Sequence, residues 1–150
     1  MNPRFGIVVS RFNEEITGKL LVNCLRTLKE NGVPARRIHV VRVPGGFEIP
    51  WAAQELARSR RFDAVICLGA VLKGQTPQND FISAATFVHI QRISLETRVP
   101  CILGVITPKT WAQAVARTKG SFDRGSEAAQ AALEMAALKA ETAKLRRKNG

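Results

Sequence analysis

The sequence is poor in the residues that usually build metal sites and disulfide frameworks. It contains two histidines, His39 and His89, and three cysteines, none of them close to another along the chain. A zinc site needs several such ligands in characteristic pairs, so we expect no metal. Cys24, Cys67 and Cys101 each lie within an apolar segment, and we expect them to be buried, reduced thiols.

Long apolar runs and an export signal are also missing. A membrane-spanning helix needs roughly 20 consecutive apolar residues, and the hydrophobic stretches here are much shorter, which predicts no contact with a membrane. Met1, Asn2, Pro3 and Arg4 lead directly into an apolar strand-like segment, without the successive regions of a signal peptide. We therefore expect a cytoplasmic protein.

Negative charge is scarce, with 12 acidic residues against 23 Lys and Arg and a net charge of +11. Part of the excess lies in residues 139–150, which we expect to form a basic, frayed helical tail: Lys139, Lys144, Arg146, Arg147 and Lys148. The remaining cations are scattered and no aromatic stacking platform accompanies them, so we expect no nucleic-acid binding. Anionic small molecules suit a chain of this charge.

Short apolar runs alternate regularly with amphipathic stretches along the chain. Since there is no internal repeat or linker, 150 residues predict one domain over 1–150. The expected strands are 5–10, 38–43, 63–69 and 101–107, and the expected helices are 16–28, 49–58, 80–97, 111–117 and a last one from about 126. This alternation predicts an α/β fold in which helices cover both faces of a four-stranded parallel sheet, in three layers.

Ligands of such sheets bind beyond the carboxyl ends of the strands, so four loops should converge on one edge: 11–13, 44–47, 70–79 and 108–109. In the first loop, Phe12 is placed either to stack on a planar heterocycle or to fold back over the sheet edge. Asn13 is a candidate for the cap of the following helix.

The next two loops are rich in groups that suit a polar ligand. Gly45 and Gly46 can bring backbone amides close to it, and Glu48 can accept hydrogen bonds from sugar hydroxyls or simply begin a helix. Residues 73–76 combine a cation, a flexible glycine and a hydroxyl ahead of a helix, which suits a phosphate, although an ordinary surface loop is the alternative. The residues alone predict a site for a planar, phosphorylated or hydroxylated small molecule.

Six segments, in order along the chain, resemble those of the lumazine synthase family: 10–13, 43–50, 63–66, 74–76, 104–107 and 125–129. The run Pro-Gly-Gly-Phe-Glu-Ile-Pro at 44–50 is the most specific of them. The resemblance implies flavodoxin-like subunits in a homopentamer or a decamer, with the site between neighbouring subunits. It also implies a cofactor-free condensation of 5-amino-6-ribitylaminouracil with 3,4-dihydroxy-2-butanone 4-phosphate to 6,7-dimethyl-8-ribityllumazine, a step of riboflavin biosynthesis.

The resemblance also implies roles for individual residues. Phe12, beside Asn13, would stack on the pyrimidine, and the backbone of Val71 and Leu72 would meet the edge of the ring. The ribityl chain would be held by Gly46, Phe47 and Glu48. The phosphate would lie on Gly74, Gln75 and Thr76, clamped by Arg117 of the adjacent subunit.

Three positions depart from the family pattern. Gln78 stands where relatives carry a histidine thought to shuttle protons, Leu103 replaces a phenylalanine of the pyrimidine pocket, and Arg124 replaces a lysine. His89 lies about 16 Å further along the expected helix and cannot be assumed to substitute. These departures leave an alternative, a catalytically weak or inactive paralogue that binds a lumazine-like or flavin-like ligand or serves as an assembly protein.

The assembly expected from the sequence is a pentamer or two joined pentamers, and not a shell of sixty subunits. Four residues precede the first expected strand, which is too few for an N-terminal strand exchanged with a neighbour, and the loop 117–124 is short. An alanine-rich face of the last helix would allow close packing against a partner: Ala128, Ala129, Ala132 and Ala136.

Overall fold

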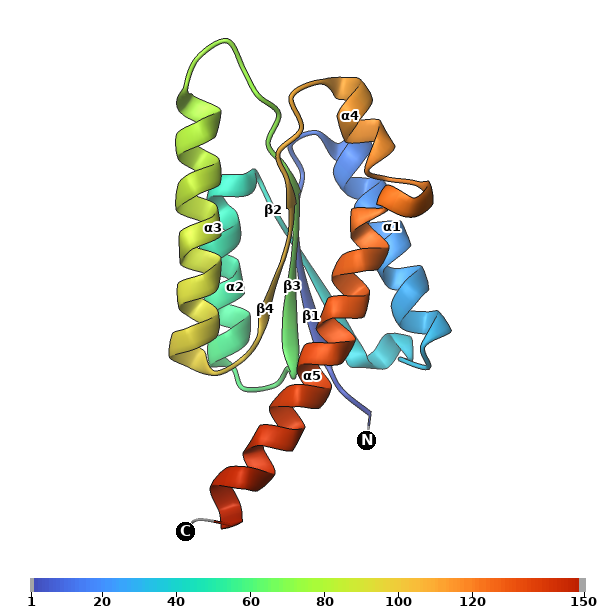
Figure 1. Ribbon diagram of the computed structural model, residues 1–150, viewed down its shortest axis with the longest axis vertical. Coiled ribbons are helices and arrows are strands. Elements are labelled where there is room, and N and C mark those ends of the chain that lie inside the picture. Colours follow the sequence, from blue (N-terminus) through green and yellow to red (C-terminus); the bar gives the residue numbers. More distant parts are fainter. Residues whose placement is uncertain (1, 149–150) are drawn as a thin grey trace.

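The computed structural model describes residues 2–148 and has a four-stranded parallel sheet between two layers of helices (Figure 1). The strands are β1 (Phe5–Ser10), β2 (Ile38–Val43), β3 (Ala64–Ala70) and β4 (Cys101–Ile106), in the spatial order β2-β1-β3-β4. All three strand pairs are parallel. The predicted three-layer α/β/α fold is therefore confirmed.

The helices divide between the two faces of the sheet. Helices α2 (Ile49–Arg58) and α3 (Gln78–Thr97) cover one face, whereas α1 (Glu14–Glu30), α4 (Trp111–Ala116) and α5 (Arg124–Lys148) lie on the other (Figure 1). Short 3-10 turns occupy Ala35–Arg37, Gly46–Glu48 and Gly120–Phe122. Successive side chains of a strand point to opposite faces, so Ile7 and Val9 of β1 join the core under α1 and α5, and Val8 joins the other core.

Several boundaries differ by one or two residues from those expected, including both ends of α1 and the end of α4. Strand β3 begins and ends one residue later than expected, and just ahead of it the carboxylate of Asp63 accepts a hydrogen bond from the Arg4 backbone N–H. Strand β4 ends at Ile106. Helix α3 begins two residues early, at Gln78, because the Pro77 carbonyl already accepts from the amides of its first turn.

Helix α5 also begins two residues early, at Arg124, because Asp123 caps it. The Oδ1 atom of Asp123 accepts from the backbone N–H of Gly125 at 3.1 Å and of Ser126 at 3.2 Å. A capping carboxylate satisfies amides that have no partner within the helix. The helix then runs to Lys148, with Lys139 paired to Asp63, and residues 149–150 of the predicted tail lie outside the described range.

The alanine-rich face of α5 is buried inside the subunit, so the prediction that it packs against a partner is wrong. The four alanines lie in one core cluster with residues of α1 and the sheet: Ala128, Ala129, Ala132 and Ala136. The approach of α5 to α1 is so close that a Cβ atom on Gly125 would lie 2.3 Å from the Leu20 carbonyl oxygen. Small side chains are what allow this helix pair to pack tightly.

Within residues 2–148 no helix is long and apolar enough to cross a membrane. The three cysteines are free and buried, as predicted. Burial disfavours the thiolate and raises the pKa of both Cys24 and Cys101 to about 12, and it raises the pKa of Cys67 well above its ordinary value.

Candidate functional site

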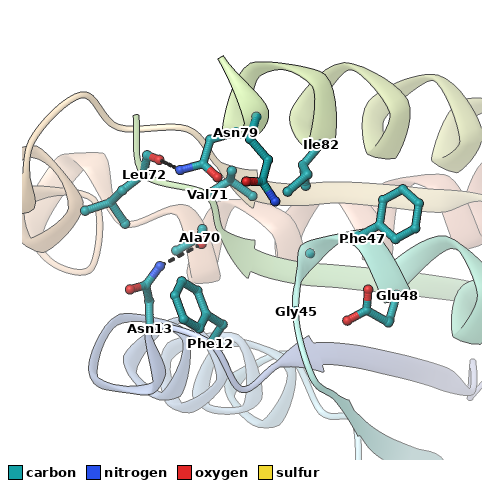
Figure 2. Close-up of a pocket in the computed structure, with 12 residues that line it drawn as sticks. Phe12, Asn13, Gly45, Phe47, Glu48, Ala70, Val71, Leu72, Asn79 and Ile82 are labelled. Carbon is teal, nitrogen blue, oxygen red and sulfur yellow. Dashed lines mark hydrogen bonds between the residues drawn. The ribbon is translucent and has the colours of Figure 1, made fainter. Parts of the chain in front are cut away.

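A pocket of about 690 Å³ opens at the carboxyl ends of β1, β2 and β3 (Figure 2). Three of the four predicted loops line it, together with the first turns of α3. The lining residues are Phe12 and Asn13, Gly45 to Glu48, Ala70 to Leu72, and Gln78, Asn79 and Ile82. The fourth loop lies in a neighbouring cleft, which Lys109 and Lys73 both line.

Two exposed aromatic rings stand on opposite sides of this pocket. Phe12 is 72% exposed and Phe47 is 66% exposed, and Figure 2 shows them separated across the cavity. The reading in which Phe12 folds back over the sheet edge is therefore wrong. Its backbone is held by a hydrogen bond from the Phe12 N–H to the Pro44 carbonyl, 2.9 Å long, so the ring is presented to solvent from a fixed loop.

Asn13 does not cap α1 with its side chain, contrary to the expectation. It adopts a left-handed conformation with φ of 60°, which asparagine tolerates better than most residues. Its side-chain amide instead donates to the Ala70 carbonyl at 3.0 Å. This bond ties the loop after β1 to the end of β3.

The second loop approaches β3 closely because of a glycine. A Cβ atom on Gly46 would lie 3.0 Å from a methyl group of Val71, and the Gly46 carbonyl accepts from the Thr86 hydroxyl at 3.3 Å. Glu48 stands at the N-cap position of α2, as expected for a residue that begins a helix, but its side chain makes no capping hydrogen bond. Its carboxylate is the one ionisable side chain among the residues that line the pocket.

Gln78 also lines the pocket, as the exposed first residue of α3. The expected phosphate loop of Gly74, Gln75 and Thr76 comes just before it and is exposed to solvent. The first backbone amides of a helix have no partner within it, and those of α3 follow this loop directly. This geometry is compatible with an anion at the mouth of the pocket.

The remaining predicted residues lie elsewhere in the chain. Leu103, Arg117 and Arg124 line a second pocket of about 340 Å³ along β4, the strand at one edge of the sheet. Leu103 is 49% exposed there. The backbone N–H of Arg124 donates to the Arg117 carbonyl at 2.9 Å, which joins the two ends of the short loop. One chain alone does not bring these arginines into the pocket of Phe12.

Asn79, at the end of the expected loop 70–79, and Ile82, beyond it, also line the pocket, although neither was singled out from the sequence. The side-chain amide of Asn79 donates to the Leu72 carbonyl, which closes the loop between β3 and α3. A polar residue at the start of a helix that follows a candidate ligand loop was a signal that could have found Asn79. Among residues 2–148 no three His, Cys, Asp or Glu side chains gather into a metal site.

Comparison with known proteins places this pocket in a family. The model of the 6,7-dimethyl-8-ribityllumazine synthase family matches residues 2–140. The chain is also 46% identical over 136 residues to a 6,7-dimethyl-8-ribityllumazine synthase of Salinibacter ruber, covering 90% of this chain and 87% of that protein. A match of this extent spans the whole sheet and all the loops that line the pocket. The chain therefore belongs to the 6,7-dimethyl-8-ribityllumazine synthase family.

Proposed function

We propose that this protein condenses 5-amino-6-ribitylaminouracil with 3,4-dihydroxy-2-butanone 4-phosphate to give 6,7-dimethyl-8-ribityllumazine. The observation that carries the proposal is the convergence of the family's loops on one pocket, with an exposed ring, a carboxylate and a helix start around it. In this reading Phe12 stacks on the pyrimidine and Glu48 accepts hydrogen bonds from the ribityl hydroxyls. The phosphate lies at Gly74, Gln75 and Thr76.

The condensation depends mainly on positioning, in our proposal. The reaction joins an amine to a carbonyl carbon and releases phosphate and water, so protons must move on both partners. The carboxamide of Gln78 cannot exchange protons near neutral pH as an imidazole does. Holding two reactants in a reactive geometry can by itself contribute several orders of magnitude in rate.

We further propose a homopentamer, or two pentamers, in which each site is completed by a neighbouring subunit. Two observations support a partner copy. Arg117 and Arg124 lie in the pocket along β4, apart from the phosphate loop that they would serve. In addition, Phe81, Val88 and Leu95 recur every seven residues along α3 and are 70%, 58% and 71% exposed, which leaves an apolar stripe for another copy to cover.

Light scattering on the purified protein tests the assembly. We expect a mass of five or ten subunits. A particle of about sixty subunits would contradict the predicted number of subunits. A monomer would also contradict the proposal that neighbouring subunits share the site.

An assay with both substrates, following the fluorescence of the lumazine, tests the reaction. We expect product only when both substrates are present, and a fall in kcat/KM for Phe12→Ala. Trp51→Ala is the matched control, because Trp51 is an aromatic residue on α2 that is equally exposed, at 70%, and is not part of the pocket lining. Absence of product from protein that binds both substrates would refute the proposal.

A further inference from the structure

The edge of β3 that faces the pocket continues beyond the end of β1. Past Ala70 the chain stays extended: the Val71 N–H donates to the Ile106 carbonyl at 2.9 Å, and the Lys73 N–H donates to the Pro108 carbonyl at 3.1 Å. Both bonds point toward β4 and the loop after it. In an extended chain the peptide groups of alternate residues point to opposite sides. The backbone groups of Leu72 therefore face the side where β1 has ended and the pocket begins.

Two asparagine side chains donate hydrogen bonds to main-chain carbonyl groups along this edge. Asn13 donates to the carbonyl of Ala70 and Asn79 donates to the carbonyl of Leu72, one from each side of the pocket, as the dashed lines in Figure 2 show. The Leu72 N–H lies between these two carbonyls. Within residues 2–148 this N–H has no hydrogen-bond partner.

The loop between β3 and α3 covers one side of the side-chain amide of Asn79. A Cβ atom on Gly74 would lie 3.2 Å from its Nδ2 atom, so the loop passes directly over the donor. The Nδ2 atom is therefore committed to the Leu72 carbonyl and packed against Gly74. Asn79 acts on a ligand mainly through the backbone that it holds.

We propose that Asn79 is a positioning residue that sets the hydrogen-bonding pattern of the pocket edge. Together with Asn13 it covers the two carbonyl acceptors and leaves the Leu72 N–H as the free main-chain donor. This edge selects a flat ring that presents a carbonyl oxygen, or another acceptor, toward Leu72. The inference rests on the proposed function, since the pyrimidine substrate is the ring that would meet this edge.

The test replaces Asn79 by aspartate, which keeps the size of the side chain but puts an acceptor against the Leu72 carbonyl. Asn31→Asp is the matched control, because the Asn31 side-chain amide also donates to a main-chain carbonyl, that of Thr27 at 2.8 Å, at the far end of α1. We expect Asn79→Asp to raise the KM for the pyrimidine about 10-fold while kcat falls less, the size of effect expected when a hydrogen bond to a buried or ligand-facing group is lost. Asn31→Asp should leave both constants unchanged.

Direct binding of the product lumazine, measured by its own fluorescence, separates this inference from the reaction. The Kd of Asn79→Asp should rise by the same factor as the KM, and its Tm should match that of Asn31→Asp. An unchanged Kd, or a higher Kd that comes with a Tm below that of Asn31→Asp, would overturn the positioning role. If the parent protein binds the product but makes none, the proposed reaction fails while the role of Asn79 is still decided by Kd.

Discussion

At the scale of single residues, position 78 is where the family resemblance implies a histidine and this chain carries Gln78. Gln78 is exposed at the start of α3 and lines the pocket, so a side chain placed there can reach a bound ligand. We predict that Gln78→His raises the rate of lumazine formation about 10-fold or more, the lower range of what a positioned acid–base group contributes. Single-turnover product formation at saturating substrates measures this directly.

The pH profile shows whether the introduced imidazole acts as a proton carrier. The variant should gain a limb in its rate profile near the ordinary histidine pKa of about 6.5, displaced upward if a phosphate is bound nearby, and the parent should lack that limb. Leu103→Phe is a separate control for ring stacking and should gain no such limb. Equal rates for the parent and Gln78→His, with binding intact, would show that the missing histidine does not limit this protein.

The buried thiols predict how stability changes at alkaline pH. Burial raises the pKa of Cys24 from 9.0 to about 12 in the folded protein. Below pH 9 the thiol is protonated in both the folded and the unfolded chain. At higher pH the unfolded chain ionises first, so the free energy of unfolding falls as the pH rises toward 12, by up to about 1.4 kcal/mol per pH unit for each such thiol.

Urea unfolding between pH 8 and 11 measures that slope. Cys24→Ala should be less stable at every pH but should lose stability less steeply above pH 9, because one titrating group is gone. The same slope in both proteins would mean that Cys24 ionises alike in the folded and unfolded chains.

At the scale of elements, the contact between α1 and α5 depends on one glycine. A Cβ atom on Gly125 would lie 2.3 Å from the Leu20 carbonyl oxygen, which is backbone and cannot turn aside. We predict that Gly125→Ala lowers the free energy of unfolding by about 2 kcal/mol or more, because the two helices must separate. Thermal or urea unfolding of the purified variant measures the loss.

Gly18→Ala is the control within the same helix pair. Gly18 lies in α1, and a Cβ atom added to it would have no neighbour within 4 Å, so alanine there should stabilise the helix by about 0.5–1 kcal/mol. A loss of stability in both variants would point to backbone strain and not to the close approach.

At the scale of the whole molecule, the proposed pentamer builds its anion site from residues of two subunits. We predict that inorganic phosphate raises the Tm of the parent protein and that Arg117→Ala weakens this stabilisation, because a ligand stabilises only in proportion to its binding to the folded state. Arg117 lies in the β4 pocket of its own chain, so the effect should also require the assembled oligomer. Differential scanning fluorimetry with increasing phosphate, on samples of known mass, measures it.

Lys119→Ala is a suitable control for the general loss of a positive charge, since Lys119 lies beside α1, away from both pockets that the anion site would use. Equal phosphate stabilisation in the parent and Arg117→Ala would rule out the clamp. Equal weakening of phosphate stabilisation in Arg117→Ala and Lys119→Ala would mean that the effect comes only from the loss of one positive charge.

Local pattern was enough to determine the secondary structure and the layers. Strands β1 and β2 and helix α2 have the expected bounds, because apolar runs and helical spacing record which side chains are buried. Where a shifted boundary has a visible cause, that cause is local hydrogen bonding, such as the cap that Asp123 supplies to α5. The buried alanines show what a local pattern leaves open. A face of small residues predicts close packing but not which surface it packs against.

By itself the sequence also determined three of the loops that line the pocket, because parallel strands bring their carboxyl ends to one edge, whereas the fourth predicted loop lies in a neighbouring cleft. Only the tertiary structure decided what each side chain does there. Asn13 and Asn79 donate to carbonyls at the end of β3 and just beyond it, and Leu103 and Arg117 lie in a different pocket from Phe12. Such pairings depend on distances between separate elements of the fold, and no local periodicity records those distances.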